Sequence, residues 1–171
     1  QLKGEPEQAL KYYYSALTIY RSLRARRGWA TALNRIADVY RELGDLESAV
    51  RFYDESLAIN RQLRYPVGEA VTSCGMAAVS AQQAQYQRAL HLYQEALEIW
   101  RVAMDVRGQA QTLLAMADIT ARQHRRVTAV GFAREAAELV NMAREGVWRR
   151  AVATITGWRS AWGEEEFRRL W

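Results

Sequence analysis

Asp38 and Asp118 are the residues whose type and spacing come nearest to a catalytic acid–base pair. They lie two periods apart in a sequence that repeats at about 40 residues. Packed helices are spaced by about 8–10 Å, so equivalent carboxylates two repeats apart would be separated by roughly 20 Å or more. Working carboxylate pairs lie about 5–9.5 Å apart. We therefore expect no catalytic role for these two residues.

The other side chains capable of chemistry are isolated in the sequence. His91 and His124 lack the clustered ligands that a metal ion needs, and Cys74 is the single cysteine. No cation flanks Cys74 to activate its thiolate, and the chain has no phosphate-binding glycine loop and no nucleophile elbow. The sequence predicts a protein that is not an enzyme and that uses no cofactor or metal.

The basic residues are the remaining chemical signal. Of 24 basic residues only Lys3 and Lys11 are lysine, which leaves 24 − 2 = 22 arginines, and the formal net charge is +5. Four doublets could contact nucleic-acid phosphates: Arg26-Arg27, Arg125-Arg126, Arg149-Arg150 and Arg168-Arg169. They lie near predicted helix ends, where cations can also interact favourably with the helix dipole. Nearby glutamates reduce the local positive charge. The sequence argues against a nucleic-acid partner, which is kept as an alternative.

A repeat of about 40 residues organises these side chains. Gly4–Leu10 aligns with Gly44–Val50 and with Ala84–Leu90. Within each unit, apolar residues recur at helical spacing in two successive segments, and no alternating strand pattern is present. Stacked units of this length bury their apolar faces against one another. The predicted fold class is therefore all-α, a right-handed superhelical solenoid of antiparallel helix pairs.

Small residues and glycines recur at fixed positions of the repeat. Ala49, Ala89 and Ala129 are expected where two helices approach closely, with Tyr53 and Tyr93 beside them. Gly44 is expected to end a first helix, and Asp45 to cap the next. A second set of glycines, at positions 28, 68 and 108, is expected to mark the turn before each first helix.

The repeat predicts one continuous domain over residues 1–171. Its units are 1–27 (the second helix of a truncated repeat), 28–67, 68–107, 108–145 and a terminal capping helix at 146–171. The first residues resemble the tail of a preceding unit, so we expect a piece of a longer polypeptide. No apolar run is long enough to cross a membrane, and we expect a cytoplasmic protein.

These patterns resemble the tetratricopeptide repeat. Ala49, Tyr53 and Ser56 match the small–aromatic–small pattern of its second helix, and Leu33, Ile36, Ala37 and Tyr40 match that of its first. The 40-residue length is similar to the repeats of partner-of-inscuteable scaffolds, kinesin light chains and bacterial signalling regulators. The resemblance implies a module that binds proteins or peptides.

Helix geometry assigns the concave groove to the first helix of each unit. Its candidate residues are Asn34, Asp38, Arg41, Cys74, Ala78, Gln82, Leu114, Asp118, Arg122, Trp158 and Trp162. We expect a peptide or partner domain there, with an apolar middle and a basic residue facing an aspartate. Two alternatives stay open: the tryptophans seal the terminal repeat, or the open repeat ends self-associate.

Overall fold

The computed structural model describes residues 4–143 and 148–170, and these residues form nine α-helices and no strand. The helices are α1 (Gly4–Ser22), α2 (Arg26–Glu42), α3 (Leu46–Gln62), α4 (Pro66–Gln82), α5 (Tyr86–Val102), α6 (Val106–Arg122), α7 (Arg126–Ala143), α8 (Trp148–Trp162) and α9 (Glu164–Leu170). The chain divides within α5 into two compact units, residues 1–92 and 93–171.

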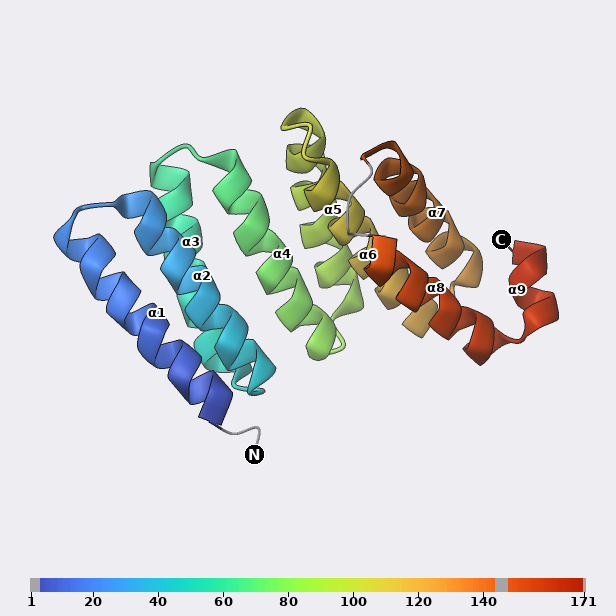
Figure 1. The fold of residues 1–171 in the computed structure, drawn as a ribbon, viewed down its shortest axis with the longest axis horizontal. Helices are drawn as coiled ribbons and strands as arrows, with labels where there is room; N and C mark the ends of the chain where they lie inside the picture. Colours follow the sequence, from blue (N-terminus) through green and yellow to red (C-terminus); the bar gives the residue numbers. More distant parts are fainter. Residues whose placement is uncertain (1–3, 144–147, 171) are drawn as a thin grey trace. The chain divides into compact units, whose positions relative to one another are not determined.

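In the first unit each helix packs against the next in the sequence. The order is α1 on α2, α2 on α3 and α3 on α4, and α2 also contacts α4. In Figure 1, α2 and α4 lie in front of α3. The first helices α2 and α4 therefore form one face of this unit, which is the face that carries the predicted groove residues.

In the second unit α6 packs against α7, and α8 contacts both of them. The short helix α9 packs on α7 and α8. Trp158 and Phe167 are buried with Ala117, Ala129 and Ala133 in one core cluster. The two units together confirm the predicted fold class, an all-α solenoid of antiparallel helix pairs.

The predicted core positions are buried. Ala49, Ala89 and Ala129 are fully buried, and the rings of Tyr53 and Tyr93 are buried as well. Methyl-sized side chains at these positions let neighbouring helices approach, and the aromatic rings fill the adjoining space. This part of the sequence prediction is confirmed.

Six helix ends are built in the same way, at intervals of 20 residues. In each, one residue takes a positive φ, between 49° and 83°. These residues are Arg24, Gly44, Arg64, Ala84, Met104 and His124. Around Gly44, the Gly44 N–H donates to the carbonyl of Arg41 (3.1 Å) and the Asp45 N–H to that of Tyr40 (2.9 Å), which is a Schellman motif. The Asp45 side chain then accepts a hydrogen bond from the Ser48 N–H at 3.0 Å, so the predicted cap is confirmed.

The glycines at 28, 68 and 108 do not mark turns, so that prediction is wrong. Each lies in the first turn of a first helix, against a side chain from eight residues earlier. A Cβ built on these glycines would lie 2.4–2.5 Å from that side chain, and the pairs are Gly28 with Tyr20, Gly68 with Asn60 and Gly108 with Trp100. The glycines therefore serve close packing between consecutive helices.

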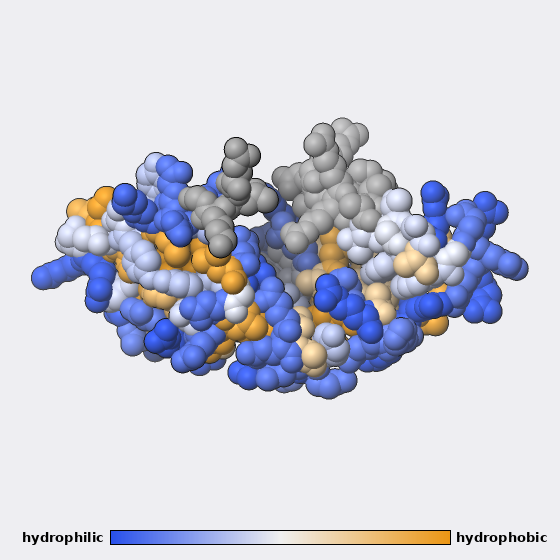
Figure 2. Space-filling view, turned by 90° about the horizontal axis from the view of Figure 1, so that it is seen from below, coloured by the Kyte–Doolittle hydropathy of each residue, from blue (hydrophilic) through white to orange (hydrophobic). Residues whose placement is uncertain are grey.

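Two further features concern the chain's end and surface. The segment 146–171, predicted as one capping helix, contains α8 and α9 in its described residues, with Gly163 between them at a φ of +88°. On the first unit, at the left of Figure 2, hydrophobic and hydrophilic residues alternate over the end that carries the α2–α3 turn. No single type of residue dominates that end.

Candidate functional site

The predicted groove residues all lie on the first helices α2, α4, α6 and α8, but they differ in depth. Asn34, Leu114 and Trp158 are buried, so a ligand can reach them only if neighbouring side chains move. The others are half-buried or exposed: Asp38, Arg41, Cys74, Ala78, Gln82, Asp118, Arg122 and Trp162. The accessible candidate surface is therefore narrower than the predicted one.

Asp38 is the most firmly held of the accessible residues. The Tyr53 hydroxyl donates a hydrogen bond to its Oδ1 at 2.6 Å, and the guanidinium of Arg35 lies 3.3 Å from its Oδ2. Burial, followed by the nearby Asp38 charge, raises the pKa of Tyr53, so the phenol stays protonated and keeps donating. The Asp38 side chain remains 31% exposed. The result is a fixed carboxylate that solvent and ligands can reach.

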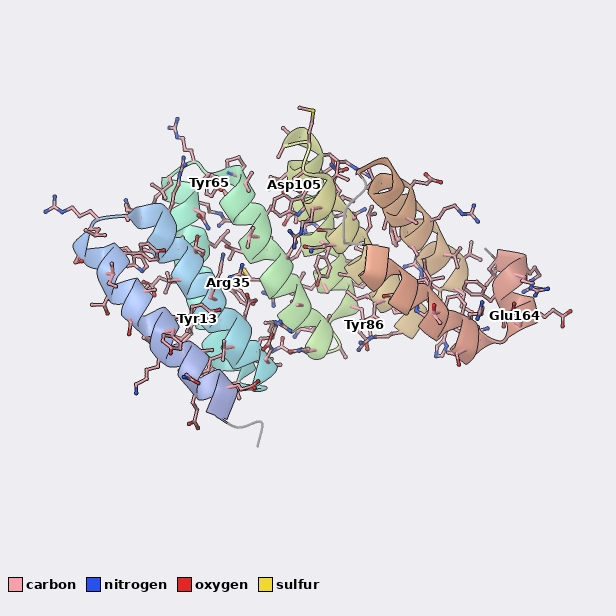
Figure 3. All side chains as sticks on the ribbon, in the orientation of Figure 1. Tyr13, Arg35, Tyr65, Tyr86, Asp105 and Glu164 are labelled. Atoms are coloured by element: carbon pink, nitrogen blue, oxygen red, sulfur yellow. The ribbon has the colours of Figure 1, made fainter. Side chains whose placement is uncertain are left out.

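Arg41 lies one helical turn further along α2 and contributes an unused donor. Its side chain is 22% exposed, and one terminal nitrogen lies 3.8 Å from a carboxylate oxygen of Glu42. Within the described residues, its Nε is buried and has no hydrogen-bond partner. An unpaired buried donor is costly, and a ligand oxygen reaches this one only if the side chains that cover it move. In Figure 3 Arg35 lies between the ribbons of α2 and α4, on the same face.

Asn34 belongs to a buried polar network rather than to the accessible surface. The Thr72 hydroxyl oxygen lies 3.0 Å from Nδ2 of Asn34 and 3.1 Å from its Oδ1, both within hydrogen-bond distance. Ser56 and Asn60 of α3 complete the network around the same hydroxyl, at 3.3 Å each. The network joins α2, α3 and α4. Helix geometry predicts Asn34 as a groove residue, but in the structure this residue holds these helices together.

The second unit carries a looser version of the same arrangement. Asp118 is paired with Arg122 at 2.9 Å, and both side chains are about half-exposed, at 48% and 61%. In the repeat, Ala133 takes the place of Tyr53, so the second unit has no tyrosine at this position to hold its aspartate. The charge is therefore less restrained on α6 than on α2.

The two tryptophans of α8 stack on each other. Their ring centroids are 5.1 Å apart, and the guanidinium of Arg126 lies 5.4 Å from the centre of the Trp162 ring. Arg126 also pairs with Glu166 of α9. Trp158 is buried in the cluster of α6 and α7, which favours the sealing role for it. Trp162 is half-buried and retains one accessible side.

Sequence reasoning missed two residues of the site. Arg35 and the Tyr53 hydroxyl both hold Asp38, but Tyr53 follows it by 15 residues on another helix. Helical spacing within α2 does place Arg35 one turn before Asp38, which is the signal that could have identified this pair.

Neither a metal centre nor a membrane-spanning helix is found in the part of the chain that the structure describes. Among the described residues no cluster of histidine, cysteine and carboxylate side chains could hold a metal ion. None of the helices in the described ranges has the length and apolar content needed to cross a bilayer.

Comparisons with known proteins agree with this architecture. Two family models described as tetratricopeptide repeat match residues 1–62 and 74–105. No curated protein matches the chain by sequence.

Three solved structures have similar folds. BtubC (BKLC) from P. vanneervenii gives a TM-score of 0.67 at 20% identity, covering 82% of this chain and 59% of BtubC. A putative kinesin light chain of Podospora anserina with nearly identical TPR-like repeats gives 0.68 at 14% identity, covering 98% and 84%. The apo form of RapI gives 0.61 at 12% identity, covering 94% and 72%. The chain thus spans less than two thirds of BtubC, and identities this low concern the fold alone.

Proposed function

Because the chain belongs to the tetratricopeptide repeat family, we propose that it is a non-enzymatic module that binds a peptide or partner domain along its first helices. Tetratricopeptide repeats are typical of protein–protein interaction modules. On the first unit the binding face is that of α2 and α4, with Asp38, Arg41, Cys74, Ala78 and Gln82. On the second unit α6 contributes Asp118 and Arg122, and α8 contributes Trp162.

The observation that carries this proposal is the fixation of Asp38 by Tyr53 and Arg35. A charged side chain that is already held in one geometry loses little conformational entropy when a partner binds. A basic residue of the partner would pair with Asp38, and an oxygen of the partner would accept from the partly exposed guanidinium of Arg41. On α4, Cys74 and Ala78 add two small, half-buried side chains.

We place this module within a larger signalling or scaffold protein of the cytoplasm. Self-association through the repeat ends stays a prediction from the sequence, and sedimentation of the purified chain at rising concentration tests it.

The test uses short peptides selected from a displayed random library against the immobilised chain. Selected peptides are titrated against the wild type and against an Asp38→Asn, Asp118→Asn double variant. Asparagine keeps an oxygen that can accept from Tyr53, so the fold is retained and only the charge is lost. We expect binding to weaken about tenfold, because a preorganised charge contact is removed.

The matched control is the Asp54→Asn, Glu138→Gln variant, which removes two exposed carboxylates from second helices α3 and α7. It should bind as the wild type does. Equal affinity of all three proteins for every selected peptide would reject the first-helix face as the binding surface.

A further inference from the structure

Six arginines gather at one end of the first unit, away from the first-helix face. They lie in or beside the turns α1–α2 and α3–α4, which share the upper end of this unit in Figure 1. We name them the arginine edge: Arg21, Arg24, Arg26, Arg27, Arg61 and Arg64. All six are exposed.

Side-chain contacts join the two turns into one surface. The guanidinium of Arg26 donates to the side-chain oxygen of Gln62, and that of Arg27 lies 4.7 Å from the centre of the Tyr65 ring. Figure 3 places Tyr65 at the α3–α4 turn. Arg21 stacks in the same way over Trp29, at 4.8 Å. Stacked guanidinium groups keep the edges of their planes free for oxygen ligands.

Acidic side chains compensate little of this charge. Glu69 lies 3.7 Å from Arg61. Arg24 and Arg64, at the tips of the turns, form no side-chain hydrogen bond or ion pair with the described residues. The opposite end of the same unit carries Glu42, Asp45 and Glu47 as well as arginines. The positive charge is therefore concentrated at one end of the helices.

Helix stability explains only part of this placement, because Arg21 and Arg61 lie in the last turns of α1 and α3, where cations are favoured. Arg26 and Arg27 occupy the first turn of α2, which contains no acidic residue and has no side-chain cap at Ala25. Cations at a helix N-terminus oppose the helix dipole. Arg26 and Arg27 therefore lower the stability of α2 in the free protein, and an anionic partner would offset this cost.

We propose that the arginine edge binds an acidic segment of a partner protein. Arginine forks bind carboxylates in a bidentate manner, and the six arginines offer several such positions over two adjacent turns. Leu23, which is 69% exposed between Arg21 and Arg24, adds an apolar contact for a peptide side chain.

Nucleic acid fits this surface less well. Single strands need open aromatic faces for base stacking, whereas Trp29 and Tyr65 are already covered by Arg21 and Arg27. The proposed surface also goes beyond the peptide-binding face, because it uses the turns and not the exposed side of α2 and α4.

The experiment measures fluorescence anisotropy of a labelled peptide of alternating glutamate and alanine with the purified chain. The variant is Arg24→Gly, Arg64→Gly. Both positions have positive φ (54° and 49°), which glycine accepts readily, so the variant should fold at least as well as the wild type. We expect about tenfold weaker binding of the peptide at low salt and a smaller difference at high salt.

The control variant is Arg51→Ala, Arg88→Ala, which removes the same charge from α3 and α5 and keeps a good helix former at both positions. It should retain most of the wild-type affinity. The proposal is overturned if the peptide does not bind, if both variants weaken it equally, or if duplex DNA or phosphatidylserine vesicles bind the edge more tightly than the peptide. The Asp38→Asn, Asp118→Asn variant should bind the acidic peptide as the wild type does. The experiment therefore distinguishes failure of the arginine-edge proposal from failure of the proposed first-helix binding face.

Discussion

Each unit contains a close contact between consecutive helices, α3–α4 in the first unit and α5–α6 in the second. The backbone arrangement is the same in both, but a different side chain fills the space beside the glycine. In the first, Gly68 lies against the amide of Asn60, which belongs to a buried polar network. In the second, Gly108 lies against the indole of Trp100, which is buried. The repeat therefore fixes where the helices approach, and the side chain that fills the space is free to vary.

The two fillings differ in what they demand of their neighbours. A buried polar network stabilises to the extent that its donors and acceptors have partners, and in this one Asn60 Oδ1 has none among the described residues. An indole needs close packing, and a small change of volume beside it is costly. The first unit should thus be sensitive to loss of a hydroxyl, and the second to added atoms.

The largest expected effect is that of Thr72→Val in the first unit. The Thr72 hydroxyl contacts Asn34, Ser56, Asn60 and the carbonyl of Gly68. Its loss leaves the buried amide of Asn34 without a partner among the described residues and removes one of the two partners of Asn60 Nδ2, so the free energy of unfolding should fall by about 3 kcal/mol. Urea denaturation followed by circular dichroism measures the change.

Thr112→Val is the matched change in the second unit. The Thr112 hydroxyl donates to the carbonyl of Gly108 at 2.8 Å. Ala96 and Trp100 take the places of Ser56 and Asn60, so these two polar contacts of Thr72 have no counterpart in the second unit. We expect a loss of about 1 kcal/mol. If both threonine variants lost the same free energy of unfolding, the polar network of the first unit would stabilise no more than the packed indole of the second.

Gly108→Ala should have the next largest effect. The new Cβ would lie 2.5 Å from the Trp100 ring, which is rigid and buried, so overpacking should cost about 2 kcal/mol. Gly131→Ala on α7 is the control, because nothing lies within 4 Å of its Cβ position. Alanine there should stabilise the helix by about 0.5–1 kcal/mol. Thermal unfolding of both variants shows whether they shift in opposite directions.

The sequence predicted the burial of Ala49 and Tyr53 because apolar spacing within a helix repeats from unit to unit. It did not predict that Tyr53 would hold Asp38, since that bond depends on how two helices are rotated against each other. Asn34 shows the same limit. Helix geometry gives the face on which a residue lies, but Thr72, on the next first helix, decides whether its amide is covered.

The glycines show what a regular spacing leaves open. Residues 28, 68 and 108 recur every 40 residues, and both a turn and a close helix contact would explain such a spacing. The side chain eight residues earlier distinguishes the two interpretations. A close helix contact requires a bulky or branched side chain there, which then lies over the glycine. The same residue type at the same interval can thus serve different physical needs.

The smallest expected effect concerns the helix ends, where the two units can be compared directly. Gly44 and Met104 occupy equivalent Schellman positions with φ of 83° and 52°. A side chain at positive φ is strained, so Gly44→Ala should lower the free energy of unfolding by about 1 kcal/mol, and Met104→Gly should raise it by up to about 1 kcal/mol. Met104 is largely exposed, so replacing its side chain removes little packing.

Urea denaturation of the two variants measures the change in the free energy of unfolding and its sign in each case. If Met104→Gly destabilised the protein, the exposed methionine would have to contribute a contact that outweighs its backbone strain, and the six helix ends would not be interchangeable.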